Sequence, residues 1–142
     1  MPQEFKHVIV PVDFSDDSER ALETALTVFG DKADEISLIT VCESVSNRHT
    51  EMIAEIDEMM EDTVQKEVQT FVKKFEGRHK NLKAYVRKGS AAPQILLAAK
   101  EMNADLIVMG SQGRNSLARV FFGSTTYDVA RKAHCSVFVI RF

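Results

Sequence analysis

Short runs of bulky apolar residues alternate along the chain with longer segments in which apolar positions recur every three or four residues. Runs of the first kind are typical of buried strands, and segments of the second kind are typical of amphipathic helices. Five β-branched runs predict strands, at His7 to Asp13, Ile36 to Cys42, Leu82 to Lys88, Asp105 to Met109 and Ser136 to Arg141. The run at 82–88 alternates apolar with polar residues, so we expect it at an edge of the sheet.

Amphipathic segments separate the expected strands. The first begins at a capping residue, Ser15 or Asp16, and ends at Gly30. The others run from about Glu51 to Gly77, from Ser90 to about Met102, and from about Ser124 to Ala133. We expect Ser90 to cap the third segment. Strands that alternate with helices predict one doubly wound α/β domain, residues 1–142, with a parallel sheet.

The long second segment opens with a run of methionine and acidic residues, MIAEIDEMMED (52–62). Such a run is compatible with a metal site or a partner site. A methionine face packed on the core beside a solvated acidic face is the simpler interpretation, because methionine is a common filler of apolar cores. We therefore expect the methionines of this segment to be packed.

Composition excludes several classes of partner. The formal charge of −3 gives no general attraction for nucleic acid or for an anionic membrane. No apolar run approaches the roughly 18 residues of a membrane span, and no cationic flank of a secretory signal precedes the first apolar run. We expect a cytoplasmic protein. Cys42 and Cys135 have no zinc-binding spacing and are expected to be small buried side chains in a reducing compartment.

A glycine-containing stretch, MGSQGRNSLARVFFGSTT (109–126), follows the fourth expected strand. Its glycines are Gly110, Gly113 and Gly123. In a doubly wound sheet this stretch lies beyond the carboxyl ends of the strands, where ligands bind, and glycine lets the backbone approach a ligand or take positive φ. Three hydroxyl residues open the last helix, whose N-terminus can hold a phosphate: Ser124, Thr125 and Thr126. Arg114 can supply charge.

Two interpretations of this stretch stay open on physical grounds, a phosphate site or turns and caps without a ligand. The chain contains neither a P-loop, GxxxxGK(S/T), nor a GxGxxG after the first strand. Asp13 ends the first expected strand, in the loop PVDFS that begins at Pro11. A carboxylate there can accept hydrogen bonds from a ribose or hold a Mg²⁺ ion that bridges phosphates. A capping or solvated aspartate is the alternative.

Three segments resemble the universal stress protein family: VIVPVDFSDDSERAL, KGSAAPQIL and ADLIVMGSQGRNSLARVFFGSTTYDVARKAHCSVFVIR. The most specific part is the pattern G-x2-G-x9-G-(S/T) of the family's ATP-binding branch, which fits at Gly110, Gly113, Gly123 and Ser124. The resemblance implies a five-stranded parallel sheet in the order 3-2-1-4-5, a Rossmann-like fold of the adenine nucleotide alpha hydrolase type. The loops after the first and fourth strands then flank one crevice.

The resemblance also implies that the crevice binds ATP or another adenine nucleotide, together with Mg²⁺. ATP-binding members seat the adenine near the residues that match Val12, Asp13 and Val41. Ribose and phosphates lie along the residues that match Met109, Gly110, Gly113, Gly123, Ser124, Thr125 and Thr126. Many members pair their last strands antiparallel, which implies a homodimer through Ser136 to Arg141.

The leading hypothesis is therefore an ATP-binding regulatory protein of the stress response that is not an enzyme and acts on an unidentified protein partner. A weak ATPase, or a protein that phosphorylates itself on Ser124 or Thr125, is one alternative, although no base is spaced beside the glycines. A nucleotide-free interaction module of the same fold is another. A receiver-type phosphorylation switch is disfavoured because the third strand ends in Lys88-Gly89 with no aspartate.

Overall fold

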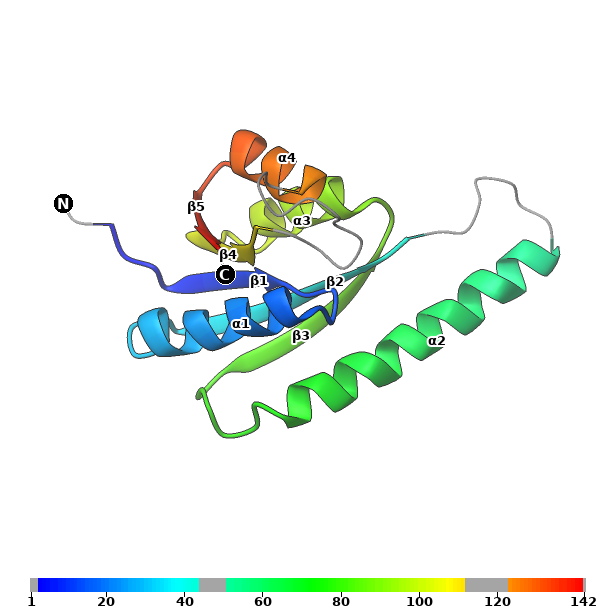
Figure 1. The fold of residues 1–142 in the computed structure, drawn as a ribbon, viewed down its shortest axis with the longest axis horizontal. Coiled ribbons are helices and arrows are strands. Elements are labelled where there is room, and N and C mark those ends of the chain that lie inside the picture. Colours follow the sequence, from blue (N-terminus) through cyan, green and yellow to red (C-terminus); the bar gives the residue numbers. More distant parts are fainter. Residues whose placement is uncertain (1–2, 44–50, 112–122, 142) are drawn as a thin grey trace.

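The computed structural model describes residues 3–43, 51–111 and 123–141, with the backbone alone at 51–54 and 57. Its strands form one five-stranded parallel sheet in the order β3-β2-β1-β4-β5 (Figure 1). The strands are β1 (His7–Pro11), β2 (Glu35–Cys42), β3 (Leu82–Lys88), β4 (Leu106–Gly110) and β5 (Ser136–Ile140). The expected strand order is confirmed, and β3 lies at an edge as its alternating pattern predicts.

Helices cover both faces of this sheet (Figure 1). They are α1 (Asp16–Thr24), which continues as the π-helical segment η1 (Ala25–Phe29), α2 (Glu51–Lys73), α3 (Ala91–Glu101) and α4 (Ser124–Lys132). Along β1, Val8 and Val10 pack in a core with residues of α1 and α2, whereas Ile9 packs in a second core with residues of α3 and α4. All three side chains are fully buried. A strand covered on both faces explains the uninterrupted apolar run.

The two predicted serine caps have different outcomes. Ser15 caps α1, because its Oγ accepts a hydrogen bond from the N–H of Ser18 at 3.2 Å. Ser90 is the capping residue of α3, as predicted, yet its side chain makes no capping hydrogen bond. A capping oxygen bonds the second or third N–H of a helix, and the third residue of α3 is Pro93, which has none.

The predicted end of β1 shifts, whereas the predicted end of the first helical segment at Gly30 is confirmed but has a different cause. The regular strand β1 ends at Pro11 rather than at Asp13, although the N–H of Val12 still donates to the Ile39 carbonyl at 2.9 Å. Gly30 ends the first helical segment in a right-handed conformation, with φ −59°. A Cβ there would clash with the carbonyl oxygen of Leu26, so close packing, and not a left-handed cap, requires the glycine.

The long helix α2 is buried along its second half and exposed along its first. Val68 and Phe71 are 5% exposed, whereas Ile56, Met59 and Met60 are 40%, 68% and 41% exposed. Figure 1 shows the cause, since the first half of α2 extends beyond the strands. The expectation that the methionines of this segment are packed is therefore wrong for Met59 and Met60.

A polar network lies at the opposite end of the sheet from the predicted crevice. His7 Nε2 lies 2.8 Å from Ser37 Oγ and 2.8 Å from a carboxylate oxygen of Glu35, and its Nδ1 lies 2.9 Å from the Met102 carbonyl. Burial by itself raises the pKa of Glu35, but hydrogen bonds from Ser37 and Lys83, with the charges of His7 and Lys83, hold that pKa below its ordinary value. The network therefore contributes stability that depends on pH.

The prediction that the cysteine side chains are buried is confirmed for Cys42 and only in part for Cys135, which is half-buried. Burial raises the pKa of the Cys135 thiol above its ordinary value, with a smaller contribution from the charge of Asp105. Within residues 3–43, 51–111 and 123–141, no helix combines the length and the apolar character needed to span a bilayer.

Candidate functional site

A cavity of about 510 Å³ opens at the carboxyl ends of β1, β2 and β4, beside the first turn of α4. Ten of the residues predicted from the sequence line it: Pro11, Val12, Asp13, Val41, Met109, Gly110, Gly123, Ser124, Thr125 and Thr126. Gly113 and Arg114, the other two, lie outside the described residues. The strand order reverses between β1 and β4, so the cavity occupies the topological position where doubly wound folds bind ligands.

Further residues line the cavity that the sequence analysis did not name: Phe14, Ser18, Ile39, Thr40, Glu43, Val64, Glu67, Ala91 and Ile95. Glu43 directly follows β2, and the rule that ligands bind beyond strand ends points to it. Val64 and Glu67 belong to α2, and no spacing in the sequence brings that helix to this edge of the sheet. The cavity thus has a wall from α2 that the motif alone does not reveal.

The loop between β1 and α1 holds Asp13 at the cavity through local hydrogen bonds. One carboxylate oxygen of Asp13 accepts from the N–H of Ser15 at 3.0 Å and from its Oγ at 2.5 Å. The N–H of Asp13 donates to Ser18 Oγ at 3.3 Å. Phe14 completes the turn with φ +64°, a left-handed conformation that is uncommon outside glycine and asparagine. Its ring packs edge-on against the ring of Phe71 in α2, with 5.7 Å between the ring centroids. Asp13 is therefore positioned by its own turn.

The first turn of α4 meets the cavity without a side-chain cap. Gly123 is the capping residue, with φ −61° and ψ 156°, and its N–H donates to the Ser111 carbonyl at 2.7 Å. A glycine cap offers no acceptor to the first N–H groups of the helix, which suits an anionic ligand. The buried Thr126 Oγ1 donates to the Gly110 carbonyl at 2.9 Å, so this hydroxyl ties α4 to β4 instead of donating to a ligand.

Gly110 is needed for close packing within the protein, whereas we expected it to let the backbone approach a ligand. A Cβ at this position would lie 3.1 Å from Cβ and 3.2 Å from the carbonyl oxygen of Asp17 in α1. The glycine therefore admits the first turn of α1 against the end of β4. It lines the cavity as well, yet the close approach shown by the structure is to the protein's own helix.

Acidic side chains dominate the charge of the described lining. Asp13, Glu43 and Glu67 contribute carboxylates, and none of the lining residues in the described part of the chain is lysine or arginine. No cluster of three or more metal-ligating side chains occurs among the residues that the structure describes. A ligand with several negative charges consequently needs a counter-charge that these residues do not supply.

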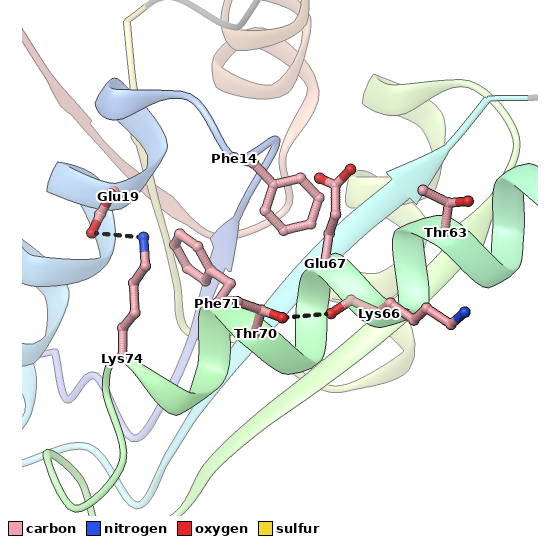
Figure 2. Close-up of a pocket in the computed structure, with 8 residues that line it drawn as sticks. All are labelled: Phe14, Glu19, Thr63, Lys66, Glu67, Thr70, Phe71 and Lys74. Atoms are coloured by element: carbon pink, nitrogen blue, oxygen red, sulfur yellow. Dashed lines mark hydrogen bonds and ion pairs between the residues drawn. The ribbon is translucent and has the colours of Figure 1, made fainter.

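A second, smaller cavity of about 360 Å³ lies between the β1–α1 loop and α2 (Figure 2). Its lining residues are Phe14, Glu19, Thr63, Lys66, Glu67, Thr70, Phe71 and Lys74. Phe14 and Glu67 line both cavities, so they form the boundary between them. At the far end, Lys74, directly after α2, forms an ion pair with Glu19 of α1, with its Nζ 3.8 Å from a carboxylate oxygen (Figure 2).

Comparison with known proteins settles the family. The model of the universal stress protein family matches residues 4–141. The chain belongs to the universal stress protein family. This universal stress protein is 28% identical over 140 residues to universal stress protein MJ0531 of Methanocaldococcus jannaschii, covering 96% of this chain and 82% of that relative. It is also 28% identical over 147 residues to YxiE of Bacillus subtilis, covering 96% and 99% of the two chains.

Solved structures of the family share the fold. Universal stress protein UspA from Lactobacillus plantarum matches with a TM-score of 0.78 and 29% identity, covering 99% of this chain and 100% of that one. A universal stress protein in complex with cAMP has a TM-score of 0.69 and 20% identity, covering 97% and 98%. A family member from Arabidopsis thaliana with AMP bound has a TM-score of 0.63 and 19% identity, covering 96% and 91%. These last two likenesses show the fold.

Proposed function

We propose that the chain binds an adenine nucleotide in the cavity at the carboxyl ends of β1, β2 and β4. One observation carries the proposal, namely that apolar residues such as Val12, Ile39 and Ile95 line the same cavity as the glycine-capped first turn of α4. A purine needs an apolar surface and a phosphate needs free N–H donors, and here the two lie within one site. The volume of about 510 Å³ is that of a small-molecule site.

In this proposal the base lies near Val12, Asp13 and Val41, and main-chain groups of Val41 recognise its edge. The ribose and phosphates extend past the end of β4 toward the first turn of α4, along Met109, Gly110, Gly123, Ser124 and Thr125. Two universal stress proteins of this fold were solved with cAMP and with AMP, which supports an adenylate as the ligand.

ATP with Mg²⁺ is the specific ligand that we propose. Its phosphates would enter a cavity that already carries the carboxylates of Asp13, Glu43 and Glu67, so a bridging cation would offset the repulsion. Mg²⁺ commonly uses one or two carboxylates and the phosphates themselves while keeping several waters, and Asp13 fits that role. Arg114, outside the described residues, is a second source of positive charge.

The proposed role is regulatory rather than catalytic. The Asp13 carboxylate is already an acceptor for both Ser15 donors, which suits a positioning group more than a mobile general base. Occupancy by nucleotide would then bias the conformation that the chain presents to a protein partner in the stress response. The cytoplasm, where adenine nucleotides are abundant, is the proposed location.

We further propose a homodimer through Ser136 to Arg141. The strand β5 lies at the edge of the sheet, and none of its side chains is fully buried. Phe138, at its centre, is 41% exposed. An apolar edge strand invites pairing with another strand, and antiparallel pairing of two β5 strands across a twofold axis would cover it.

Calorimetry with purified protein tests the proposed ligand. ATP, ADP, AMP and cAMP are titrated with and without Mg²⁺, and GTP serves as a control of equal charge. We expect saturable heat with adenylates, and adenine nucleotide in the extract of denatured protein by mass spectrometry. Absence of heat at about 1 mM ATP with Mg²⁺, and of any co-purifying nucleotide, would leave the nucleotide-free interaction module as the function.

A further inference from the structure

The first half of α2 carries a group of exposed apolar side chains, Ile56, Met59 and Met60, here called the apolar patch. The other large apolar side chains exposed in the described part of the chain lie on separate elements: Val28, Leu97, Tyr127 and Phe138. Single exposed apolar residues are ordinary, but three within five positions of one helix form a contiguous surface. Methionine is over-represented on surfaces that bind amphipathic helices.

The apolar patch continues into the smaller cavity. Steps of three or four residues along α2 join the patch to residues that line this cavity and place them on one helical face: Ile56, Met60, Thr63, Glu67 and Thr70. Figure 2 shows the rings of Phe14 and Phe71 beside this face. At 1.5 Å per residue, the face runs for about 25 Å from residue 56 to residue 73, enough for a helix of four to five turns.

Acidic residues border the apolar patch. Residues 51–62 contain six acidic residues and no basic one. Glu55, Glu58 and Asp62 are exposed, and we call them the acidic flank. Glu55 and Asp62 lie one turn before and one turn after Met59, so they border it directly. A second copy docked patch to patch across a twofold axis would bring two acidic flanks together, which electrostatic repulsion opposes.

We propose that this face of α2 binds a basic amphipathic helix of a partner protein. The apolar side of the partner helix packs on the apolar patch and along the smaller cavity toward Phe14 and Phe71. Its lysine or arginine residues lie beside the acidic flank, at the end of the face away from Lys66 and Lys74, which line the smaller cavity. Anchors spaced along one helical face give the affinity, and charge complementarity selects a cationic partner. The inference does not rest on nucleotide binding, since the apolar patch lies outside the larger cavity.

Fluorescence anisotropy of labelled peptides tests this surface on the full chain. The probe is an 18-residue amphipathic helix of leucine and lysine, and the control peptide has the same composition in an order that spreads the leucines around the helix. We expect the probe to bind at least about tenfold more tightly than the control. The double variant Ile56→Gln/Met59→Gln should weaken the probe about tenfold, because it removes apolar contact without changing charge.

Matched variants separate the surface from general effects. Glu55→Lys/Glu58→Lys should weaken the probe and flatten the dependence of its affinity on salt, whereas Glu4→Lys/Glu76→Lys makes the same change in net charge elsewhere and should have a smaller effect. Leu97→Gln, on α3, should bind the probe like wild type. Equal affinity for both peptides would overturn the proposal, as would wild-type affinity in Ile56→Gln/Met59→Gln. A smaller mass by light scattering for that variant would instead assign the patch to a second copy and would also overturn it.

Discussion

Replacing Gly123 by aspartate tests the proposed phosphate position without disturbing the fold. The backbone of Gly123, at φ −61° and ψ 156°, is extended, so any residue can adopt it. Aspartate is among the preferred N-terminal capping residues, and it stabilises a helix by a few tenths of a kcal/mol relative to glycine. Its carboxylate would accept hydrogen bonds from the first turn of α4, at the place proposed for the phosphates. The substitution therefore keeps the helix and opposes the ligand.

The expected loss of nucleotide affinity is large. A carboxylate and a phosphate charge about 5 Å apart repel by about 3 kcal/mol at an effective dielectric constant of about 20, which corresponds to about a 100-fold loss. Calorimetry with ATP and Mg²⁺ measures the affinity, and thermal unfolding checks that stability is unchanged or slightly higher. Gly123→Asn is the matched control, because it caps the helix without charge, and it should lose about tenfold. Unchanged ATP affinity in a folded Gly123→Asp protein would refute the proposed phosphate position.

Other predictions concern stability, cation and assembly. Glu35→Gln lowers the free energy of unfolding at pH 7, because the folded-state pKa of Glu35 lies below its ordinary value of 4.5. In denaturant titrations, the difference in this free energy between variant and wild type should shrink as the pH falls below 4.5. A difference that stays constant with pH would contradict this prediction. Chelation of Mg²⁺ weakens ATP binding more than AMP binding, because AMP brings less charge to the acidic lining, and equal effects by calorimetry would count against the proposed role of Asp13. Phe138→Lys converts the proposed dimer to a monomer of 16.0 kDa in light scattering, whereas an unchanged mass would exclude β5 as the interface.

The sheet and the position of the cavity could be predicted because they follow from simple periodic signals. β-branched runs covered on both faces, such as that containing Val8 to Val10, identify buried parallel strands. The strand order came from a family resemblance and not from periodicity. Once that order is known, the rule for strand ends brings Asp13, Gly110 and Gly123 to one crevice, where the structure has them.

Features that depend on contacts between distant segments could not be predicted from the sequence. The hydrophobic period of α2 identifies an apolar face but not what covers that face. Met59 and Met60 are exposed because the first half of the helix extends beyond the strands. A glycine in a motif indicates only that a Cβ would be too close to something. At Gly110, the residue that a Cβ would approach is Asp17 of α1. A serine before a helix predicts a capping hydrogen bond, but Pro93, the third residue of α3, has no N–H to donate to the serine oxygen.

Titration of ¹⁵N-labelled protein with ATP and Mg²⁺, followed by two-dimensional NMR, tests both the ligand and its place. We predict that the largest amide shifts fall on the residues that line the larger cavity, above all Asp13, Val41, Gly110, Gly123 and Thr125. Amides of the His7 network, at the other end of the sheet, should hardly move. Absence of shifts at about 1 mM ATP, or shifts confined to residues away from this cavity, would contradict nucleotide binding at this site.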